Sequence, residues 1–436
     1  MIGLSIRFSF ILVSIFQPCP GHPCYAENSA PPYMFTATKT GYLAVMNPSS
    51  DAVQHDGCDP PHSVWFLARH GTRYPSAVAM GPMSKQLPKI RDQVVANHKA
   101  GRGELCDQDL VRLADWSFNL TSDDELLLTE SGIEEMKGLG RRWRSRLPYL
   151  VDQIVLTNNT FGFTNTQRTK ESARHFQEGL LNVTNVELPL PIPNKELLHF
   201  YKNCKKYREA IFQKKTSEKE VKKLFRSYKL PGLKKIVEDV NKRLGYRIKT
   251  ISLKAVELIW DMCRWEMSWY KDKSKWHWCA IFTRKEMKML EDNEDIFFYF
   301  QDGYAYNITR DMTGVLLSDL LTLLKENSRD NNRFYFAHSE TFLPFLTRLG
   351  IAKDDPPLSL TNLPSDRKWR TSLIGGESSN LAVVRLKCGG HNKLVFYLNE
   401  RIVSFPGCRN NICDLDEFVT TFEKFKLENI NEVCEV

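Results

Sequence analysis

The chain has 436 residues, of which 42% are hydrophobic, and a formal net charge of +8. This length and composition exclude an intrinsically disordered chain and favour one large domain with an insertion, or two domains. The net charge is modest for the length, so the positions at which basic residues gather matter more than their total.

The first 26 residues have the features of a secretory signal peptide. Arg7 precedes the apolar stretch 8–16, which is too short to cross a bilayer, and "CYA" offers a small-residue cleavage site ending at Ala26. The prolines that follow argue against the alternative, an N-terminal core helix. We therefore expect residues 1–26 to be removed.

Other features agree with export. Of eleven cysteines, nine remain after this removal, which predicts disulfides with one thiol left over. Cysteines and histidines do not occur at zinc-binding spacing, so we predict neither a metal site nor a cofactor. The C-terminal "NEVCEV" has no ER-retention tetrapeptide and no hydrophobic tail, so we expect a secreted or lumenal product (ER lumen or lysosome) without an integral membrane span. Glycan acceptor motifs stand at Asn119, Asn158, Asn182 and Asn307.

Residues 27–181 have the pattern of the first part of an α/β core. The apolar run Ser63–Ala68 suits a buried parallel strand. The segment Leu128–Pro148 predicts an amphipathic helix, with Ser131 and Glu134 spaced as a capping box. The arginines near its end are expected on a solvated face.

Residues 182–290 differ in character and predict a helical cap subdomain. Between Lys202 and Lys249 there are 17 Lys or Arg against 5 Asp or Glu, interleaved with apolar residues at helical spacing. Two interpretations remain open at this point: a set of solvated helix faces, or a positive lid over an anionic substrate.

The α/β pattern returns over residues 291–436. Arg333–Ala337 is a second apolar strand, and Lys393–Val403 supplies further strand material.

Charged and histidine side chains follow both apolar strands directly. Arg69, His70 and Arg73 follow the first strand, and His338 and Glu340 follow the second. In open α/β sheets, ligands bind beyond the carboxyl ends of the strands, so these residues are expected to face one crevice. Arginine guanidinium groups match phosphate oxygens in pairs, which predicts a phosphate ligand.

A third segment, Phe161–Leu180, begins like a strand and continues as a helix, with Arg168 just before the helix. A cation at a helix N-terminus is unfavourable unless an anion binds there. The alternative is an arginine bent into solvent.

These residue types fit phosphoryl transfer without a metal. Arginines stabilise charge on the phosphoryl oxygens, and a neutral imidazole can attack phosphorus to give a phosphohistidine. We predict His70 as the nucleophile and His338 as a hydrogen-bond donor to the phosphate. Glu340 would protonate the departing oxygen and then activate water.

Three motifs, "RHGTRYP" (Arg69–Pro75), "QRTKESA" (Gln167–Ala173) and "HSET" (His338–Thr341), together resemble the histidine acid phosphatases. Thr72, Tyr74 and the carboxylate two places after the second histidine resemble the multiple inositol polyphosphate phosphatases within that superfamily. That branch has His-Ala-Glu where this chain has Ser339 in place of the alanine.

The resemblance implies an α/β fold: a phosphoglycerate-mutase-like core with a mainly parallel central sheet flanked by helices, plus an inserted α-helical cap. It implies a small-molecule polyphosphate substrate, namely inositol hexakisphosphate and lower inositol polyphosphates, with 2,3-bisphosphoglycerate as a further candidate. With that substrate, part of the basic cap surface is expected to bind phosphates outside the pocket. The implied phosphate-pocket residues are Arg69, His70, Arg73, Arg168 and His338, with Glu340 as proton donor. The implied disulfides are Cys58–Cys388, Cys204–Cys434, Cys263–Cys279 and Cys408–Cys413, with Cys106 free.

Two rival functions remain open. One is a histidine acid phosphatase of broad specificity, and the other is a secreted polyanion-binding protein without catalysis. Nucleic acid is not an expected partner, because the chain has a secretory signal and no recognisable binding module.

Overall fold

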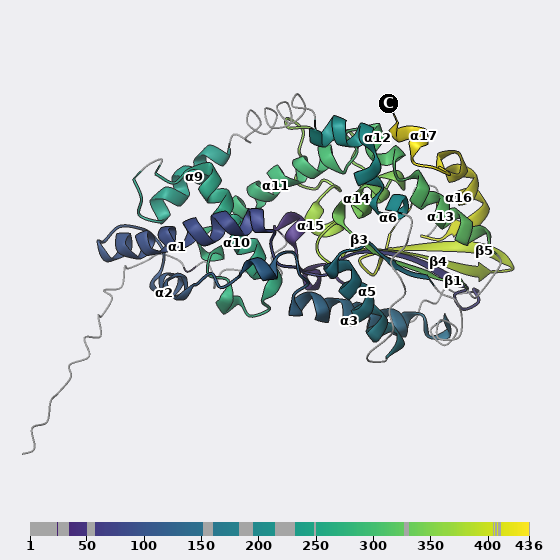
Figure 1. Ribbon diagram of the computed structural model, residues 1–436, viewed down its shortest axis with the longest axis horizontal. Helices are drawn as coiled ribbons and strands as arrows, with labels where there is room; N and C mark the ends of the chain where they lie inside the picture. Colours follow the sequence, from purple (N-terminus) through teal and green to yellow (C-terminus); the bar gives the residue numbers. More distant parts are fainter. Residues whose placement is uncertain are drawn as a thin grey trace, which may run out of the picture.

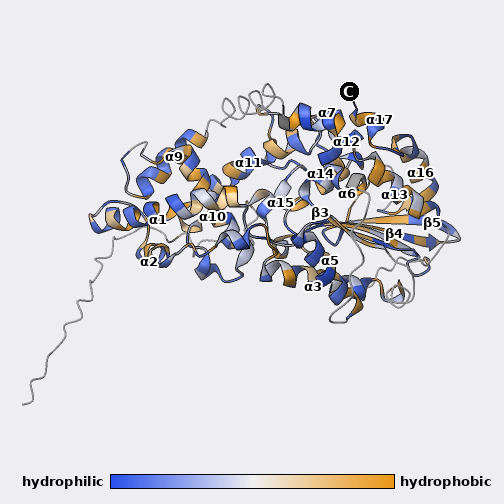
Figure 2. Ribbon diagram, in the orientation of Figure 1, coloured by the Kyte–Doolittle hydropathy of each residue, from blue (hydrophilic) through white to orange (hydrophobic). Residues whose placement is uncertain are grey.

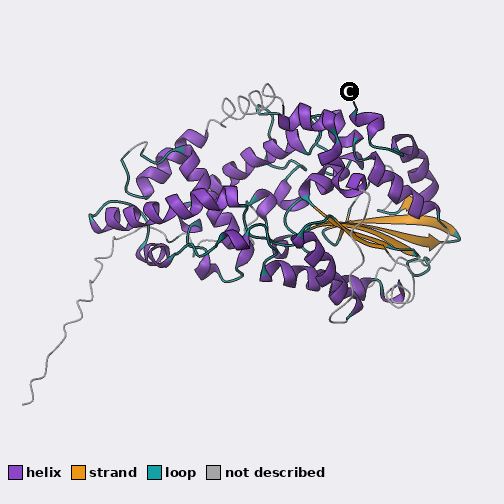
Figure 3. Ribbon diagram, viewed as in Figure 1, coloured by secondary structure: helices purple, strands orange, loops and turns teal. Residues whose placement is uncertain are grey.

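The computed structural model describes residues 24, 35–49, 57–150, 160–182, 195–213, 232–247, 250–326, 331–403, 405, 408 and 411–435. These residues form a part built around one β-sheet and a second part made of helices, which lie side by side in Figures 1 and 3. Apart from Cys24, the predicted signal peptide lies outside the described residues, as do Asn158 and residues 214–231 of the basic run.

The described sheet has the strand order β2-β3-β1-β4-β5-β6, with β7 paired to β5. Its strands are β1 (Ser63–Arg69), β2 (Thr160–Phe163), β3 (Arg333–Ala337), β4 (Asn380–Cys388), β5 (His391–Leu398), β6 (Arg401–Ile402) and β7 (Cys413–Asp414). Strands β2, β3 and β1 are parallel, whereas β4 to β7 add antiparallel pairings. The predicted α/β class is confirmed, and the parallel strands are the ones that the site residues follow.

Strand β1 is apolar from Val64 to Ala68 because both faces of the sheet are covered. Trp65 and Leu67 belong to the hydrophobic cluster on one face, whereas Val64, Phe66 and Ala68 belong to the cluster on the other. Side chains alternate between faces along a strand, so a strand covered on both sides needs an unbroken apolar run. In Figure 2 β4 and β5 are hydrophobic over much of their length and hydrophilic at the far end of their hairpin.

Helices form a layer on each face of the sheet (Figure 1). One cluster contains side chains of α3 (Glu130–Arg146) and α5 (Gln167–Leu181). The other contains side chains of α6 (Lys195–Asn203), α7 (Lys205–Tyr207), α12 (Asn307–Asp311), α13 (Gly314–Lys325), α14 (Ser339–Arg348), α15 (Thr371–Ile374), α16 (Leu415–Phe422) and α17 (Asn431–Cys434).

The helical part has a hydrophobic cluster of its own. It is built from α1 (Ala77–Lys99), α2 (Asp107–Asp115), α9 (Gly232–Arg243), α10 (Leu253–Trp269) and the first turns of α11 (Arg284–Gln301). The cap boundaries at residues 182 and 290 stay predictions. In the packing, α6 and α7 from the predicted cap segment lie with the sheet, whereas α1 and α2 lie with the cap.

Helix α3 corrects two expectations. Its N-cap is Thr129, whose side chain accepts a hydrogen bond from the Gly132 amide at 3.1 Å, so the predicted Ser131 capping box is wrong. Arg142 and Arg146 do not form a solvated face, since both pair with the fully buried Glu400. A buried carboxylate needs such partners, and sequence periodicity could not reveal one more than 250 residues away.

The predicted strand segment 393–403 is a hairpin rather than one strand. β5 and β6 are joined through Asn399 and Glu400, which both have positive φ angles of 50° and 67°. Successive positive φ angles reverse the chain in a two-residue hairpin turn. The reversal brings Glu400 to Arg142 and Arg146. The Tyr42 hydroxyl donates a hydrogen bond to the Glu400 Oε1 at 2.7 Å.

All four predicted disulfide pairings are present: Cys58–Cys388, Cys204–Cys434, Cys263–Cys279 and Cys408–Cys413. The prediction that Cys106 is free is wrong, because Cys24 pairs with it. Cleavage after Ala26 would remove Cys24, so that cleavage and this disulfide cannot both occur in one mature chain. The error arose because Cys24 was counted with the signal peptide.

Three of the four glycan acceptor motifs lie on described, exposed asparagines: Asn119, Asn182 and Asn307. Within the described ranges, every helix is too short or too polar to cross a membrane.

Candidate active site

The loop after β1 is fixed by close backbone packing against α3. A side-chain carbon on Gly71 would lie 2.7 Å from the Gly132 carbonyl oxygen, and one on Gly132 would lie 2.3 Å from the Thr72 carbonyl oxygen. The buried Glu135 of α3 accepts hydrogen bonds from the amide and the hydroxyl of Thr72, both at 3.0 Å. The Ser172 hydroxyl of α5 accepts from the Gly71 amide at 3.0 Å. The loop carrying His70 is therefore held by two helices.

His70 is oriented with one nitrogen free to react. Its Nδ1 lies 2.9 Å from the Gly71 carbonyl oxygen, which can only accept a hydrogen bond. A neutral ring therefore carries its proton on Nδ1 and keeps a lone pair on Nε2. Burial, followed by the charges of Arg69 and Arg168, lowers the pKa of His70 well below 6.5. His70 is thus a neutral imidazole whose Nε2 carries an unprotonated lone pair.

His338 caps α14 and lies beside His70, with ring centroids 5.5 Å apart. Its Nδ1 lies 3.2 Å from the Arg168 Nη2, and its Nε2 lies 2.8 Å from the Thr164 hydroxyl. Arginine can only donate, so Nδ1 accepts and the ring proton sits on Nε2, which donates to Thr164. Burial, and then Arg168, lowers the pKa of His338 well below 6.5.

The three predicted arginines converge from two segments. Arg69 ends β1, Arg73 lies in the following loop, and Arg168 lies in the first turn of α5. Arg168 faces His338, so the alternative of a side chain bent into solvent is wrong. Burial lowers the pKa of Arg73 to about 10, which keeps it charged at neutral pH. Each of the three has a buried Nε without a hydrogen-bond acceptor among the described residues.

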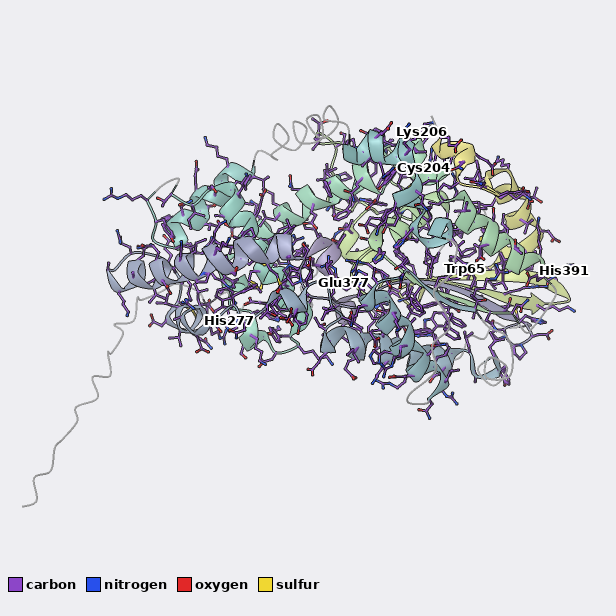
Figure 4. All side chains as sticks on the ribbon, in the orientation of Figure 1. Trp65, Cys204, Lys206, His277, Glu377 and His391 are labelled. Carbon is purple, nitrogen blue, oxygen red and sulfur yellow. A yellow bond between two sulfur atoms is a disulfide. The ribbon has the colours of Figure 1, made fainter. Side chains whose placement is uncertain are left out.

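Glu377 is a buried carboxylate that the sequence analysis missed. Its Oε1 lies 3.2 Å from the Arg69 Nη2, and its Oε2 lies 3.5 Å from the His70 Nδ1. Burial raises the pKa of Glu377, while Arg69 and Arg73 oppose that shift. Figure 4 places Glu377 where the helical part meets the sheet. The signal in "GGESSN" (375–380) was a carboxylate directly before an apolar strand.

Among the described residues, Arg69 has one carboxylate within ion-pair distance, Glu377, whereas Arg73 and Arg168 have none. Buried or partly buried cations are normally paired. The pocket therefore carries an excess of positive charge that an anion would balance.

Glu340 lies in the first turn of α14, two residues after His338. Its Oε2 accepts a hydrogen bond from the Ser339 hydroxyl at 2.9 Å. Burial lowers the pKa of Arg168, and the charge of Glu340 opposes that shift, which places this carboxylate within electrostatic reach of the arginines. Burial, and then the charge of Glu340, raises the pKa of the neighbouring Asp302 to about 8.

The helical part contributes a wall to the pocket. The Arg73 guanidinium lies over the Trp265 ring of α10, 5.2 Å from its centroid, and Lys39 lies over the same ring at 5.4 Å. The Trp269 Nε1 donates to the Arg73 carbonyl oxygen at 3.1 Å. The cap thereby holds the backbone and the side chain of one phosphate-pocket arginine.

The described basic residues of the cap segment differ in what surrounds them. On α9, Lys235 and Arg243 pair with Asp239 and Glu286, as expected for surface and structural ion pairs. On α6, the charge of Lys202 contributes to the lowered pKa of His338, after burial, Arg168 and His199. Figure 4 shows Lys206 beside Cys204, far from Glu377.

One described acidic group has oxygens close enough together to hold a metal: Glu291, Asp292 and Asp295. Arg370 lies 2.9 Å from Glu291, and Arg367 pairs with both Asp292 and Asp295. Lys288 also pairs with Asp292, at 3.1 Å, so that three basic side chains balance the three carboxylates. These residues therefore fit a structural ion-pair network better than a metal site.

A family model, the histidine phosphatase superfamily (branch 2), matches residues 62–398. The match spans most of the chain, including the three motifs, and the chain therefore belongs to this superfamily.

The relatives agree with this membership. The chain is 30% identical to multiple inositol polyphosphate phosphatase 1 of Drosophila melanogaster, over 89% of this chain and 84% of that protein. It is 25% identical to multiple inositol polyphosphate phosphatase 1 of Homo sapiens, over 87% of this chain and 84% of that protein.

Two solved structures share the fold. The phytase from D. castellii superposes with a TM-score of 0.74 at 18% identity, covering 92% of this chain and 87% of its own. The Bifidobacterium longum multiple inositol polyphosphate phosphatase, in complex with inositol hexasulfate, gives a TM-score of 0.67 at 15% identity, covering 91% and 99%.

Proposed function

We propose that this protein is a phosphomonoesterase that removes phosphates from inositol hexakisphosphate and lower inositol polyphosphates through a phosphohistidine on His70. The observation that carries the proposal is the excess positive charge beside two neutral histidines. Arg73 and Arg168 have no carboxylate within ion-pair distance among the described residues, and each has a buried Nε without an acceptor. A phosphoryl group supplies the missing negative charge and the acceptor oxygens.

The first half of the reaction forms the phosphohistidine. The Nε2 lone pair of His70 attacks phosphorus, the bond from phosphorus to the ester oxygen breaks, and the departing oxygen takes a proton from Glu340. Nδ1–H of His70 stays directed at the Gly71 carbonyl, and Glu377 balances the charge that develops on the ring. Arg69, Arg73 and Arg168 stabilise the phosphoryl oxygens.

The second half returns the enzyme to its starting state. Glu340, now a carboxylate, takes a proton from water as the water oxygen attacks phosphorus. The bond from phosphorus to Nε2 breaks, His70 becomes neutral again, and phosphate leaves. For His338 to donate to a phosphoryl oxygen through Nδ1, this nitrogen must gain a proton when the anion enters and Arg168 turns to it.

The substrate class rests on the relatives and on charge outside the pocket. The names of the relatives specify inositol polyphosphates. Lys202 of α6 and Lys39, which lies over Trp265 and pairs with Asp261 at 3.2 Å, are candidates for binding the phosphates that the arginines do not hold. 2,3-Bisphosphoglycerate, with two phosphates, fits the same charge pattern.

The testing experiment measures phosphate release from inositol hexakisphosphate by the mature chain with a chelator present, beside His70→Ala. We expect chelator-resistant release that the variant lacks. 4-Nitrophenyl phosphate separates the rivals, since an enzyme of broad specificity would give a kcat/KM on this small ester equal to or above that on inositol hexakisphosphate. Tight binding without release by the unaltered chain would favour the polyanion-binding protein and overturn the proposal.

We also propose that the chain enters the secretory pathway. The five disulfides among the described residues suit an oxidising compartment, and Asn119, Asn182 and Asn307 are exposed where a glycan could be attached. The Cys24–Cys106 disulfide favours processing before Cys24. Mass spectrometry of the secreted protein, with and without glycosidase, would identify the N-terminus and the glycosylated asparagines.

A further inference from the structure

Helix α6 carries a third histidine to the pocket. The ring of His199 lies against the ring of His338, with centroids 5.3 Å apart and planes only 7° from parallel. The ring of His199 also lies beside the ring of Tyr201, with centroids 5.7 Å apart and planes at 89°. His338 in turn lies beside His70, with centroids 5.5 Å apart, so ring contacts connect His199 through His338 to the proposed nucleophile.

The backbone beside His199 is held by α14, the helix whose N-cap residue is His338. The Thr341 hydroxyl of α14 donates to the Leu198 carbonyl oxygen at 2.7 Å. Helix α6 is kinked at His199, where φ is −115° and ψ is 24°. Just after the helix, Cys204 forms the disulfide with Cys434. The backbone on both sides of His199 is thus tied to the sheet part of the molecule.

The hydrogen bonds of His338 do not prevent its ring from tilting, and a parallel ring beside it can oppose that motion. Thr164 and Arg168 define where the two ring nitrogens point, but Arg168 must turn toward a bound phosphate. The ring then keeps one hydrogen bond, to Thr164, and can tilt about it. An offset parallel ring at this separation opposes a tilt toward it, because such a rotation would bring His338 against His199.

We propose that His199 is a positioning residue, which holds the plane of the His338 ring by stacking so that Nδ1 stays directed at the phosphoryl group. The effect of His199 on turnover rests on the proposed function. Its effect on phosphate binding can be measured independently of turnover. His199 is partly exposed rather than in the hydrophobic core, which makes substitution compatible with folding.

The test compares three substitutions that differ in shape. His199→Phe keeps a flat ring, His199→Leu keeps apolar volume without a flat face, and His199→Ala removes both. Asn203→Ala, at an exposed position of the same helix, is the matched control. For each protein we would measure kcat and KM on inositol hexakisphosphate and on 4-nitrophenyl phosphate, the Kd for inorganic phosphate by calorimetry, and Tm.

If stacking positions His338, His199→Ala and His199→Leu should lower kcat about tenfold on both substrates and weaken the binding of inorganic phosphate severalfold. The kcat and phosphate Kd of His199→Phe should stay within about threefold of those of the unaltered chain. The control should match the unaltered chain. If the alanine variant does not fold, the leucine and phenylalanine variants preserve the comparison.

Two results would overturn the inference. One is a phenylalanine variant as impaired as the leucine variant at equal Tm, and the other is unchanged kcat and phosphate affinity in the alanine or leucine variant. If the unaltered chain releases no phosphate, the proposed function fails, and the ranking of phosphate Kd values still decides whether His199 positions His338.

Discussion

Replacing Glu377 by glutamine removes the buried negative charge that faces both Arg69 and His70. The Oε2 of Glu377 lies 3.5 Å from the His70 Nδ1, and both side chains are at least 97% buried. A full positive charge on the ring at this distance would interact by about 5 kcal/mol at an effective dielectric constant of about 20. In the transition state His70 carries only part of that charge, so we expect about half of this energy to be lost.

A loss of about 2–3 kcal/mol corresponds to a fall in kcat of roughly 30-fold to 150-fold. The assay is steady-state release of phosphate from inositol hexakisphosphate and from 4-nitrophenyl phosphate, with thermal unfolding measured in parallel. Glu400→Gln is the matched control, because Glu400 is equally buried and also pairs with arginines, but lies with Arg142 and Arg146. We expect this control to lower Tm without lowering kcat.

A fall in kcat smaller than about threefold for Glu377→Gln would refute the reasoning. It would mean that the Gly71 carbonyl alone supports the charge on His70. Equal losses of kcat in both variants would show that general destabilisation, rather than the charge beside the nucleophile, is being measured.

Three further predictions concern other parts of the molecule. The unreduced mature protein should yield a peptide joining Cys24 to Cys106, and opening this loop, with its sequence separation of 82, should cost about 4.5 kcal/mol of stability by chain entropy. A free thiol at Cys106 would contradict this prediction. Trp265→Leu should lower kcat/KM about tenfold, because a cation over an aromatic ring contributes about 0.5–2 kcal/mol to holding Arg73; an unchanged kcat/KM would contradict it. In the unfolded chain His338 binds a proton near pH 6.5, but in the folded protein its pKa is well below that value. Below about pH 6.5 the unfolded state therefore binds the extra proton, and the free energy of unfolding falls by up to about 1.4 kcal/mol per pH unit. His338→Asn should lack this contribution, and parallel pH curves for the two proteins would contradict it.

The sequence by itself determined the α/β class and the residues that gather at the carboxyl ends of β1 and β3. It could do so because buried parallel strands require unbroken apolar runs, and the side chains directly after such strands share one edge of the sheet. Arg69, His70, Arg73 and His338 follow from this logic, whereas Arg168 needed the resemblance to the histidine acid phosphatases, because the helix pattern alone left a solvent-facing arginine open. The structure brings all five together.

Only the tertiary structure decided which distant groups complete the pocket. Glu377 reaches His70 across more than 300 residues of chain, and Trp265 reaches Arg73 from the helical part. His199 faces His338 because α6 packs on α14 through Thr341. Contacts of this kind depend on how helices pack in three dimensions, and a periodic pattern records only which face of a helix is buried, not what it meets.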